Sequence, residues 1–320
     1  MSKGDHVTMI DDILAITPGE GEIVDWFIDR LEVQIKQGHF LSVDKLTSVT
    51  EKIVENLSDY KNKHNINSVV VGQSGGVDSA LTAALFKQAG WIVHGVTMPI
   101  HQKVSETNRG IENIDAFRLE RHHIDLTAQF DSMQETLGAY DSSYRGLQRQ
   151  GNIKARLRMI ALYNLAHEVN GCVASTDNFS ELAAGFWTLH GDVGDVAPIQ
   201  SLTKSWEVPA MALAMGVPEN TIHALPTDGL GISNSDADQL GMNYLEFDIL
   251  LLDMLNLPEM DKEHVLEYIN TIDDGDIKDK ARLVFDRVKN TVFKRDNPFN
   301  IIHPVYSDRF AKLDKLDRSL

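Results

Sequence analysis

Apolar residues recur at three- and four-residue intervals along two stretches near the start of the chain, which indicates two amphipathic helices. The first stretch carries Ile23, Val24, Phe27, Ile28, Leu31 and Ile35, and the second carries Val43, Leu46, Val49, Ile53, Leu57 and Tyr60. Neither stretch carries a pattern typical of a catalytic or ligand-binding site. Residues 1–65 are therefore predicted to form a helical extension that packs on the core or on a partner subunit.

From residue 66 the pattern changes, because short β-branched runs now alternate with helix-like stretches. The predicted strands are 69–71, 92–96, 123–126 and 172–174, and the predicted helices are 79–89, 108–121 and 152–169. Strand, helix and strand in this order favour parallel strands with right-handed crossovers. The predicted fold class is α/β, a doubly wound parallel sheet with extra N- and C-terminal helices, and residues 66–320 are predicted to be one domain.

Two segments beyond residue 185 lose this periodicity and gain glycines. Residues 185–198 and 226–236 are too irregular for core elements, so we predict that they are lid loops over a site. From Glu246 the spacing is helical again.

A glycine-rich turn, Gly72-Gln73-Ser74-Gly75-Gly76-Val77-Asp78-Ser79, follows the first predicted strand and opens the next helix. Unpaired N–H groups and the helix dipole make such a junction an anion site. The lysine of a Walker A loop is missing, and Asp78 stands in the turn instead. An acid beside phosphates needs a cation between them, so the turn suits Mg²⁺-bound pyrophosphate.

A second polar segment, residues 175–181, follows the strand predicted at 172–174 and so reaches the same sheet edge. Its Glu181 would give Mg²⁺ a second carboxylate beside Asp78. The alternative makes Glu181 an early-helix acid, with Asp177 or Ser180 as the N-cap.

A basic residue, Arg156, borders the apolar stripe of the helix predicted at 152–169. A half-buried guanidinium needs an anion, which is either a protein carboxylate or a substrate phosphate. Lys154 and Arg158 share an outward face and are expected to be solvated.

Composition narrows the function classes. The chain has 320 residues, 42% of them hydrophobic, and 47 acidic against 30 basic residues give a net charge of −17, which argues against a nucleic-acid partner. The one cysteine, Cys172, excludes an internal disulfide and a multi-cysteine zinc site, and its apolar neighbours predict a buried thiol. With no signal-peptide pattern and no run of about 20 apolar residues, we expect a cytoplasmic protein without membrane contact.

The glycine-rich octet resembles the SGGxDS loop of the ATP pyrophosphatases. Four further motifs narrow the resemblance to the NAD⁺ synthetase family over roughly residues 42–300: Gly151-Asn152-Ile153-Lys154-Ala155-Arg156, Ser175-Thr176-Asp177 with Glu181, Gly185-Phe186-Trp187-Thr188 through Gly191-Asp192, and Pro226-Thr227. The resemblance implies a carbon–nitrogen ligase that amidates deamido-NAD⁺ with ammonia through an acyl-adenylate. ATP is the co-substrate, NAD⁺, AMP and pyrophosphate are the products, and no room remains for a nitrilase-like domain. The family is typically homodimeric.

Carried over by position, the resemblance assigns roles to single residues. Gly72, Ser74, Gly75, Gly76, Asp78 and Ser79 would bind pyrophosphate, Thr176, Lys204 and Thr227 would contact ATP, and Asp78 and Glu181 would bind Mg²⁺. Arg156, Asp195 and Lys294 would hold the dinucleotide, Phe186 would stack on the nicotinate ring, and Asp192 would lie near the ammonia site. Asp78, Lys204 and Asp192 would take part in catalysis. Each has a plainer alternative as a surface charge, turn, core or loop-capping residue.

One departure from the family pattern keeps other functions open. Leu189 stands where the family commonly has a lysine, and the loop 191–195 is one residue shorter. Amidation of nicotinate mononucleotide is therefore an alternative. A tRNA-modifying adenylating enzyme of the same superfamily and a non-catalytic nucleotide sensor are others.

Overall fold

The computed structural model describes residues 3–17, 23–138, 141–227, 229–259 and 261–297. The outer ends of the two predicted domains, and Asp228 within the predicted lid loop 226–236, lie outside the described residues.

The core of the described chain is a four-stranded parallel sheet in the order β3-β2-β1-β4. The strands are β1 (Ser68–Gly72), β2 (Ile92–Thr97), β3 (Glu120–His123) and β4 (Gly171–Val173). The chain adds β2 and β3 on one side of β1 and then returns to add β4 on the other side. This reversal between β1 and β4 creates a crevice at their carboxyl ends, where ligands bind in doubly wound folds. The predicted fold class is confirmed.

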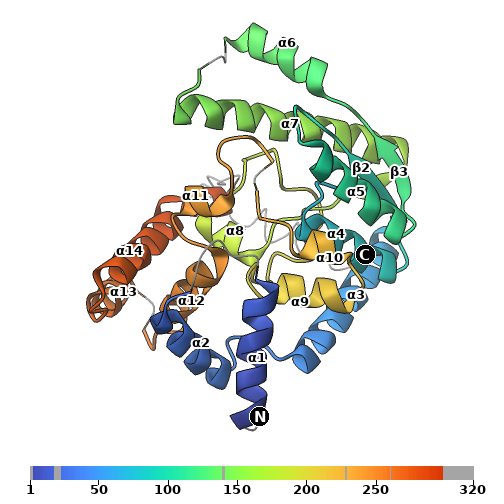
Figure 1. Cartoon of the computed structure of the whole chain (residues 1–320). Helices are drawn as coiled ribbons and strands as arrows, with labels where there is room; N and C mark the ends of the chain where they lie inside the picture. Colours follow the sequence, from blue (N-terminus) through green and yellow to red (C-terminus); the bar gives the residue numbers. More distant parts are fainter. Residues whose placement is uncertain (1–2, 18–22, 139–140, 228, 260, 298–320) are drawn as a thin grey trace, which may run out of the picture.

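Helices surround the sheet (Figure 1). The longer ones are α1 (Lys3–Ile16), α2 (Asp25–Gln37), α3 (Val43–His64), α4 (Val77–Gln88), α5 (Val104–Ala116), α6 (Thr127–Leu137), α7 (Tyr144–Glu168), α9 (Glu207–Ala214), α12 (Tyr244–Leu255), α13 (Lys262–Asn270) and α14 (Gly275–Asn290). The shorter ones are α8 (Phe179–Ala184), α10 (Glu219–Ile222), α11 (Asp236–Leu240) and α15 (Val292–Arg295).

Two hydrophobic clusters lie on the two faces of the sheet. On one face, Val70, Val96 and Val173 pack against Leu162 and other apolar residues of α7 and α6. The other face packs on α4, and this larger cluster continues through α3, α9, α12 and the N-terminal helices. Both faces are covered, which explains why the inner strands have short apolar runs instead of alternation.

Three predicted elements are displaced. The helix predicted over 108–121 is α5, which ends at Ala116, before β3 begins. The third strand is Glu120–His123, three residues before the predicted 123–126, because this edge strand is polar and gives almost no hydrophobic signal. The helix predicted from 152 begins at Tyr144, with Ser143 as its N-cap. Its apolar residues do not all face the core, since Ile160 is 66% exposed while Met159 and Leu162 are buried.

The N-terminal segment contacts a distant part of the chain, the residues just after Lys204. The Thr17 hydroxyl donates to the Ser205 carbonyl at 2.8 Å, and the Trp206 indole N–H donates to the Leu41 carbonyl at 2.7 Å. On the other side, Arg30 of α2 forms an ion pair with the buried Asp253 of α12. The extension predicted over residues 1–65 therefore packs on the core in its described part.

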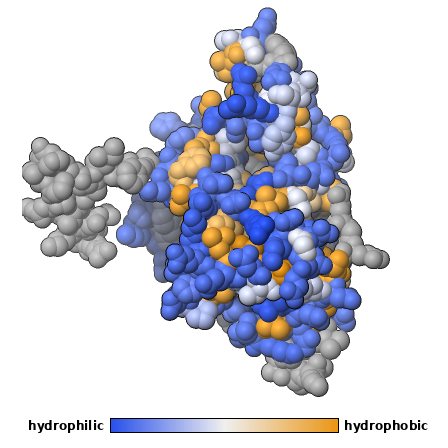
Figure 2. All heavy atoms as spheres, turned by 90° about the vertical axis from the view of Figure 1, so that its left-hand side faces the viewer, coloured by the Kyte–Doolittle hydropathy of each residue, from blue (hydrophilic) through white to orange (hydrophobic). Residues whose placement is uncertain are grey.

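The surface agrees with the acidic composition. Figure 2 shows a face that is mostly hydrophilic, with apolar side chains in small separate groups. Among the described helices, none combines the length and apolar character that crossing a bilayer requires. The single thiol, Cys172, is 5% exposed, and burial raises its pKa to about 12, so the predicted buried cysteine is confirmed.

Candidate active site

The glycine-rich turn joins β1 to α4 at the crevice between β1 and β4. Gly75 adopts φ +89°, and a Cβ there would come within 2.3 Å of the Glu106 carbonyl oxygen, so only glycine fits. The turn is held by its own hydroxyls: Ser79 Oγ donates to the Gly76 carbonyl at 2.9 Å and lies 3.2 Å from Ser74 Oγ. The start of α4 is thereby fixed with its N–H groups facing the crevice, as anion binding requires.

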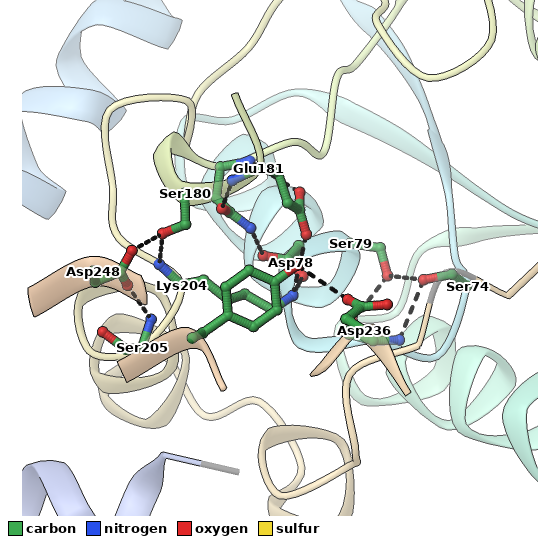
Figure 3. A network of polar contacts seen from close by, with 12 residues as sticks. Ser74, Asp78, Ser79, Ser180, Glu181, Lys204, Ser205, Asp236 and Asp248 are labelled. Atoms are coloured by element: carbon green, nitrogen blue, oxygen red, sulfur yellow. Dashed lines mark hydrogen bonds and ion pairs between the residues drawn. The ribbon is translucent and has the colours of Figure 1, made fainter. Parts of the chain in front are cut away.

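Two acids and one lysine meet beside this turn (Figure 3). The Lys204 ammonium pairs with Asp78 and lies 3.5 Å from Glu181 Oε1. Asn178 donates from Nδ2 to Asp78 Oδ1 at 2.9 Å and so orients the carboxylate. We call Asp78, Glu181, Lys204 and the turn 72–79 the acid–lysine corner.

Burial and charge compete within the corner. The side chains of Lys204, Asp78 and Glu181 are only 8%, 13% and 16% exposed. Burial works to lower the pKa of Lys204, but the charges of Asp78 and Glu181 outweigh it and raise the pKa above its ordinary value. Burial raises the pKa of Glu181, and the Lys204 charge opposes the rise. Lys204 is thus held in its charged form by the acids around it, whereas burial favours the protonated form of Glu181.

A third carboxylate shows that the lysine alone does not balance the site. Asp236, at the start of α11, is 3% exposed and accepts from the Tyr244 hydroxyl at 3.1 Å. Its charge acts on both Glu181 and Lys204. Three acids around one ammonium leave excess negative charge, and oxygen ligands of this kind are those that Mg²⁺ prefers. The donor set therefore fits a divalent cation at Asp78 and Glu181.

Glu181 also acts as a capping residue, so its interpretation as an early-helix acid is confirmed. Its Oε2 accepts from the Asn178 N–H at 3.3 Å while Asn178 Oδ1 accepts from the Glu181 N–H at 3.0 Å. The N-cap of α8 is Asn178 and not Asp177 or Ser180. The capping box leaves Oε1 directed toward Lys204.

A cavity of about 530 Å³ opens over the corner. Its walls include most of the residues singled out from the sequence: Gly72, Ser74, Gly76, Asp78, Ser79, Thr176, Glu181, Phe186, Asp192, Lys204, Thr227 and Lys294. Gly75 is not among them, because its position is on the α5 side of the turn. Both predicted lid loops contribute wall residues.

Asp192 and Lys294 face the cavity from the loop side. Asp192 Oδ2 accepts from the Thr188 N–H at 2.5 Å, and removal from solvent raises the pKa of this carboxyl. Lys294 donates from Nζ to the carbonyls of Gly185 and Trp187, and burial lowers its pKa. Lys294 is therefore a loop anchor in this structure as well as a cation on the cavity wall.

Two sequence-predicted binding residues lie away from the cavity walls. Arg156 is exposed and donates to the Leu189 carbonyl at 3.1 and 3.2 Å. Asp195 accepts from the Tyr163 hydroxyl and the Val173 N–H, both at 2.8 Å. We call these two residues the outer pair. The loop around Asp195 is tied to the sheet, because Val196 forms a parallel bridge with Ala174.

Sequence analysis missed several polar cavity residues. Arg158, expected to be solvated, lines the cavity and donates from Nε to the Met98 carbonyl at 3.2 Å. Arg287 and Asp236 line it as well. Arg158 was missed because the apolar spacing of residues 152–169 placed it on an outward face, whereas Asp236 lies at the end of a predicted lid loop.

The chain is similar to known proteins of one family. Residues 49–298 match the family model described as NAD synthase. An NH(3)-dependent NAD(+) synthetase of Methanosarcina acetivorans is 30% identical over 256 residues, which cover 77% of this chain and 94% of that protein. One of Mycoplasmopsis pulmonis is 37% identical over 207 residues, covering 62% of this chain and 78% of that protein.

Solved structures agree. The NH3-dependent NAD synthetase from Campylobacter jejuni, in complex with the nitrate ion, superimposes with a TM-score of 0.63 and 26% identity, covering 81% of this chain and 99% of the other. The NMN synthetase from Francisella tularensis gives a TM-score of 0.67 at 24% identity, covering 81% and 98%, and this likeness shows the fold alone.

Proposed function

Because the chain belongs to the NAD synthase family, we propose that it amidates deamido-NAD⁺ with ammonia and ATP, as an ammonia-dependent carbon–nitrogen ligase. Its small-molecule substrates would be deamido-NAD⁺, ATP and ammonia, and its products NAD⁺, AMP and pyrophosphate. Residues 66–320 would form the catalytic domain, with 185–198 and 226–236 as lids and 1–65 as an extension.

The observation that carries this proposal is the acid–lysine corner at the start of α4. Asp78, Glu181 and Lys204 meet where the backbone N–H groups of the turn favour an anion. Asp78, Glu181 and Asp236 outnumber the single ammonium of Lys204, so an arriving triphosphate needs additional positive charge. That requirement is typical of a nucleotide that arrives with its own divalent cation.

Mg²⁺ would be held by Asp78 and Glu181. When bound, it neutralises charge on the phosphates and makes pyrophosphate a better leaving group. Thr176 and Thr227 line the same cavity and would contact ATP, and the pyrophosphate would lie against Gly72, Ser74, Gly76 and Ser79.

The first step would form the acyl-adenylate. A carboxylate oxygen of the nicotinate attacks the α-phosphorus of ATP, a new oxygen–phosphorus bond forms, and the bond to pyrophosphate breaks. Lys204 stabilises the charge that develops on the phosphoryl oxygens, and the N–H groups of the turn receive the departing pyrophosphate. Phe186, on the cavity wall, would stack on the nicotinate ring.

The second step would transfer nitrogen. Ammonia attacks the acyl carbon, AMP leaves, and the extra proton passes to a base. Asp192 is our candidate base, since it lies on the cavity wall and its raised pKa makes proton uptake easier.

We further propose a cytoplasmic homodimer. The outer face of α7 supports it, because Ile160 and Tyr163 are 66% and 41% exposed and lie beside the outer pair, Arg156 and Asp195. A second copy on this face would bury these apolar side chains and place Arg156 and Asp195 at a shared substrate site. Lys294 would hold the dinucleotide from within the same subunit.

Purified protein tests the proposal directly. With ATP, Mg²⁺ and ammonium, deamido-NAD⁺ should be converted to NAD⁺ with one AMP and one pyrophosphate per turnover. Glutamine in place of ammonium should give little product, and EDTA should abolish turnover. Absence of NAD⁺ formation would exclude the proposal. Faster turnover of nicotinate mononucleotide would instead assign the alternative that Leu189 leaves open.

A further inference from the structure

A carboxylate that sequence analysis did not single out lies directly behind the acid–lysine corner (Figure 3). Asp248 projects from α12 and is 0% exposed. Its Oδ1 accepts from the Ser180 hydroxyl at 2.5 Å, and its Oδ2 accepts from the Ser205 N–H at 3.0 Å. The side chain therefore links α12 to two other segments of the chain.

Both of those segments carry residues of the corner. Ser180 immediately precedes Glu181 in α8, and Ser205 immediately follows Lys204. The Ser180 oxygen also accepts from the Lys204 N–H at 2.9 Å. Three hydrogen bonds thus close a ring through Asp248, Ser180 and the backbone of residues 204–205. The ring fixes the backbone of Lys204 relative to the backbone of Glu181.

The chemistry of the ring requires a carboxylate. A hydroxyl and a backbone N–H both point at the same side chain, so it must accept twice and donate nothing. Asparagine has one acceptor oxygen, and its NH₂ group would face one of these donors. An apolar residue would leave the Ser180 hydroxyl and the Ser205 N–H unpaired in the core.

The same carboxylate is costly for folding. Among the described residues no ion pair reaches Asp248, and burial raises its pKa to about 6, although the bonds from Ser180 and Ser205 oppose the rise. A buried acid without a cation partner lowers the stability of the fold. Its position between the segments of Lys204 and Glu181 indicates that it serves the site and not the stability of the fold.

We propose that Asp248 is a positioning residue, which aligns Lys204 with Glu181 and Asp78 through Ser180 and the Ser205 backbone. The proposal rests on the proposed function of Lys204 as the group that stabilises charge during adenylation. Asp248 does not reach the cavity wall itself, so it acts through the residues that it holds. A small displacement of Lys204 would misplace its ammonium with little effect on where the substrates bind.

Asp248→Asn tests this, and Asp253→Asn is the matched control. Asp253 is also a buried acid of α12, at 6% exposure, but its partners are Arg30, Gln34 and Tyr268, away from the cavity. Both variants lose a buried acid from the same helix and should lose stability. Only Asp248→Asn should lower kcat, by about 10- to 100-fold, with each KM within about threefold of wild type.

A second pair of variants probes the ring with less disturbance. Ser180→Ala removes the shared oxygen but keeps the Asp248 charge, and should lower kcat about tenfold. Ser205→Ala keeps the backbone donor and should leave kcat within twofold. The double variant Ser180→Ala with Asp248→Asn should lose less than the product of the single effects, because the two residues act as one unit.

Each result has a defined meaning. Wild-type kcat in folded Asp248→Asn, or in folded Ser180→Ala if the first variant does not fold, would overturn the positioning role. An equal kcat loss in Asp253→Asn would also overturn it, since damage to α12 would then be enough. Wild-type enzyme is assayed in parallel. Its failure to form NAD⁺ would reject the proposed function, whereas the positioning role of Asp248 is tested only by the ratio of variant kcat to wild-type kcat.

Discussion

The acid–lysine corner and the outer pair are two parts of one proposed site, but they differ in how complete they are within a single chain. In the corner, Lys204 already contacts Asp78 and Glu181, and the ring through Asp248 holds the segments of Lys204 and Glu181 together. In the outer pair, Arg156 and Asp195 bond to their own chain and lie off the cavity walls. The proposed nucleotide end is therefore preorganised, whereas the proposed dinucleotide end would need a loop movement or a second copy.

The largest expected effect is in the corner. Asp78→Asn removes one of the two proposed metal ligands and leaves Lys204 with a weaker partner. We expect kcat to fall at least about 100-fold, equivalent to about 2.7 kcal/mol of lost transition-state stabilisation. The rate of pyrophosphate release measures kcat, and Asp59→Asn, at an exposed position, is the control. Unchanged release in folded Asp78→Asn would mean that the corner is not the reaction site.

The cavity wall and the outer pair can be separated by two arginines on α7. Arg158→Ala removes a cation from the cavity wall and should raise the KM for deamido-NAD⁺ about 30-fold, a loss of about 2 kcal/mol. Arg156→Ala should raise it about fivefold, since this cation would act from the subunit contact. Initial rates with ATP saturating provide both values. An Arg156 effect larger than that of Arg158 would place the dinucleotide on the outer face of α7.

A smaller effect is expected in the pH dependence of the free energy of unfolding. Burial raises the pKa of Asp248 to about 6 from 3.8, so the native chain holds a proton that the unfolded chain releases in this window. This group therefore stabilises the fold below pH 4, and that contribution falls as pH rises toward 6, by about 1.4 kcal/mol per unit at most. Urea unfolding of wild type and Asp248→Asn from pH 4 to 7 should show a difference that declines with pH. A difference independent of pH would exclude the raised pKa.

The smallest effect concerns Cys172, which is buried on β4 and is not among the residues that line the cavity. Cys172→Ala should cost about 1 kcal/mol of unfolding free energy and leave kcat unchanged. The native thiol should also react with a thiol reagent only when the chain unfolds, because its pKa is raised to about 12. Fast labelling of native protein would contradict the buried position.

The contrast between the acid–lysine corner and the outer pair also explains which features could be predicted from the sequence. The corner is formed by a turn whose glycines and helix start dictate their own geometry, so Asp78 and the turn were accessible from local pattern alone. Strands β1, β2 and β4 were likewise predicted to within two residues, because buried parallel strands leave apolar runs.

Elements without such a signal were missed or displaced. The edge strand β3 is polar, and α9 is apolar on nearly every side because it is buried, so neither shows an alternating or amphipathic pattern. The apolar residues of α7 do not all face the core, since Ile160 is exposed, so their spacing indicated the wrong face and Arg158 was expected to be solvated. Asp248 could not be found, because its role depends on contacts 43 and 68 residues away in sequence.

The bonds from Thr17 to the Ser205 carbonyl and from Trp206 to the Leu41 carbonyl have a practical consequence for anyone who shortens this protein. Residues 49–298 are the span shared with the family, yet both bonds reach outside it to hold the segment that follows Lys204. A fragment trimmed to that span would lose two tethers at once. Poor turnover by such a fragment would then indicate that the segment after Lys204 is no longer held in place. It would not indicate a defect in the shared span itself.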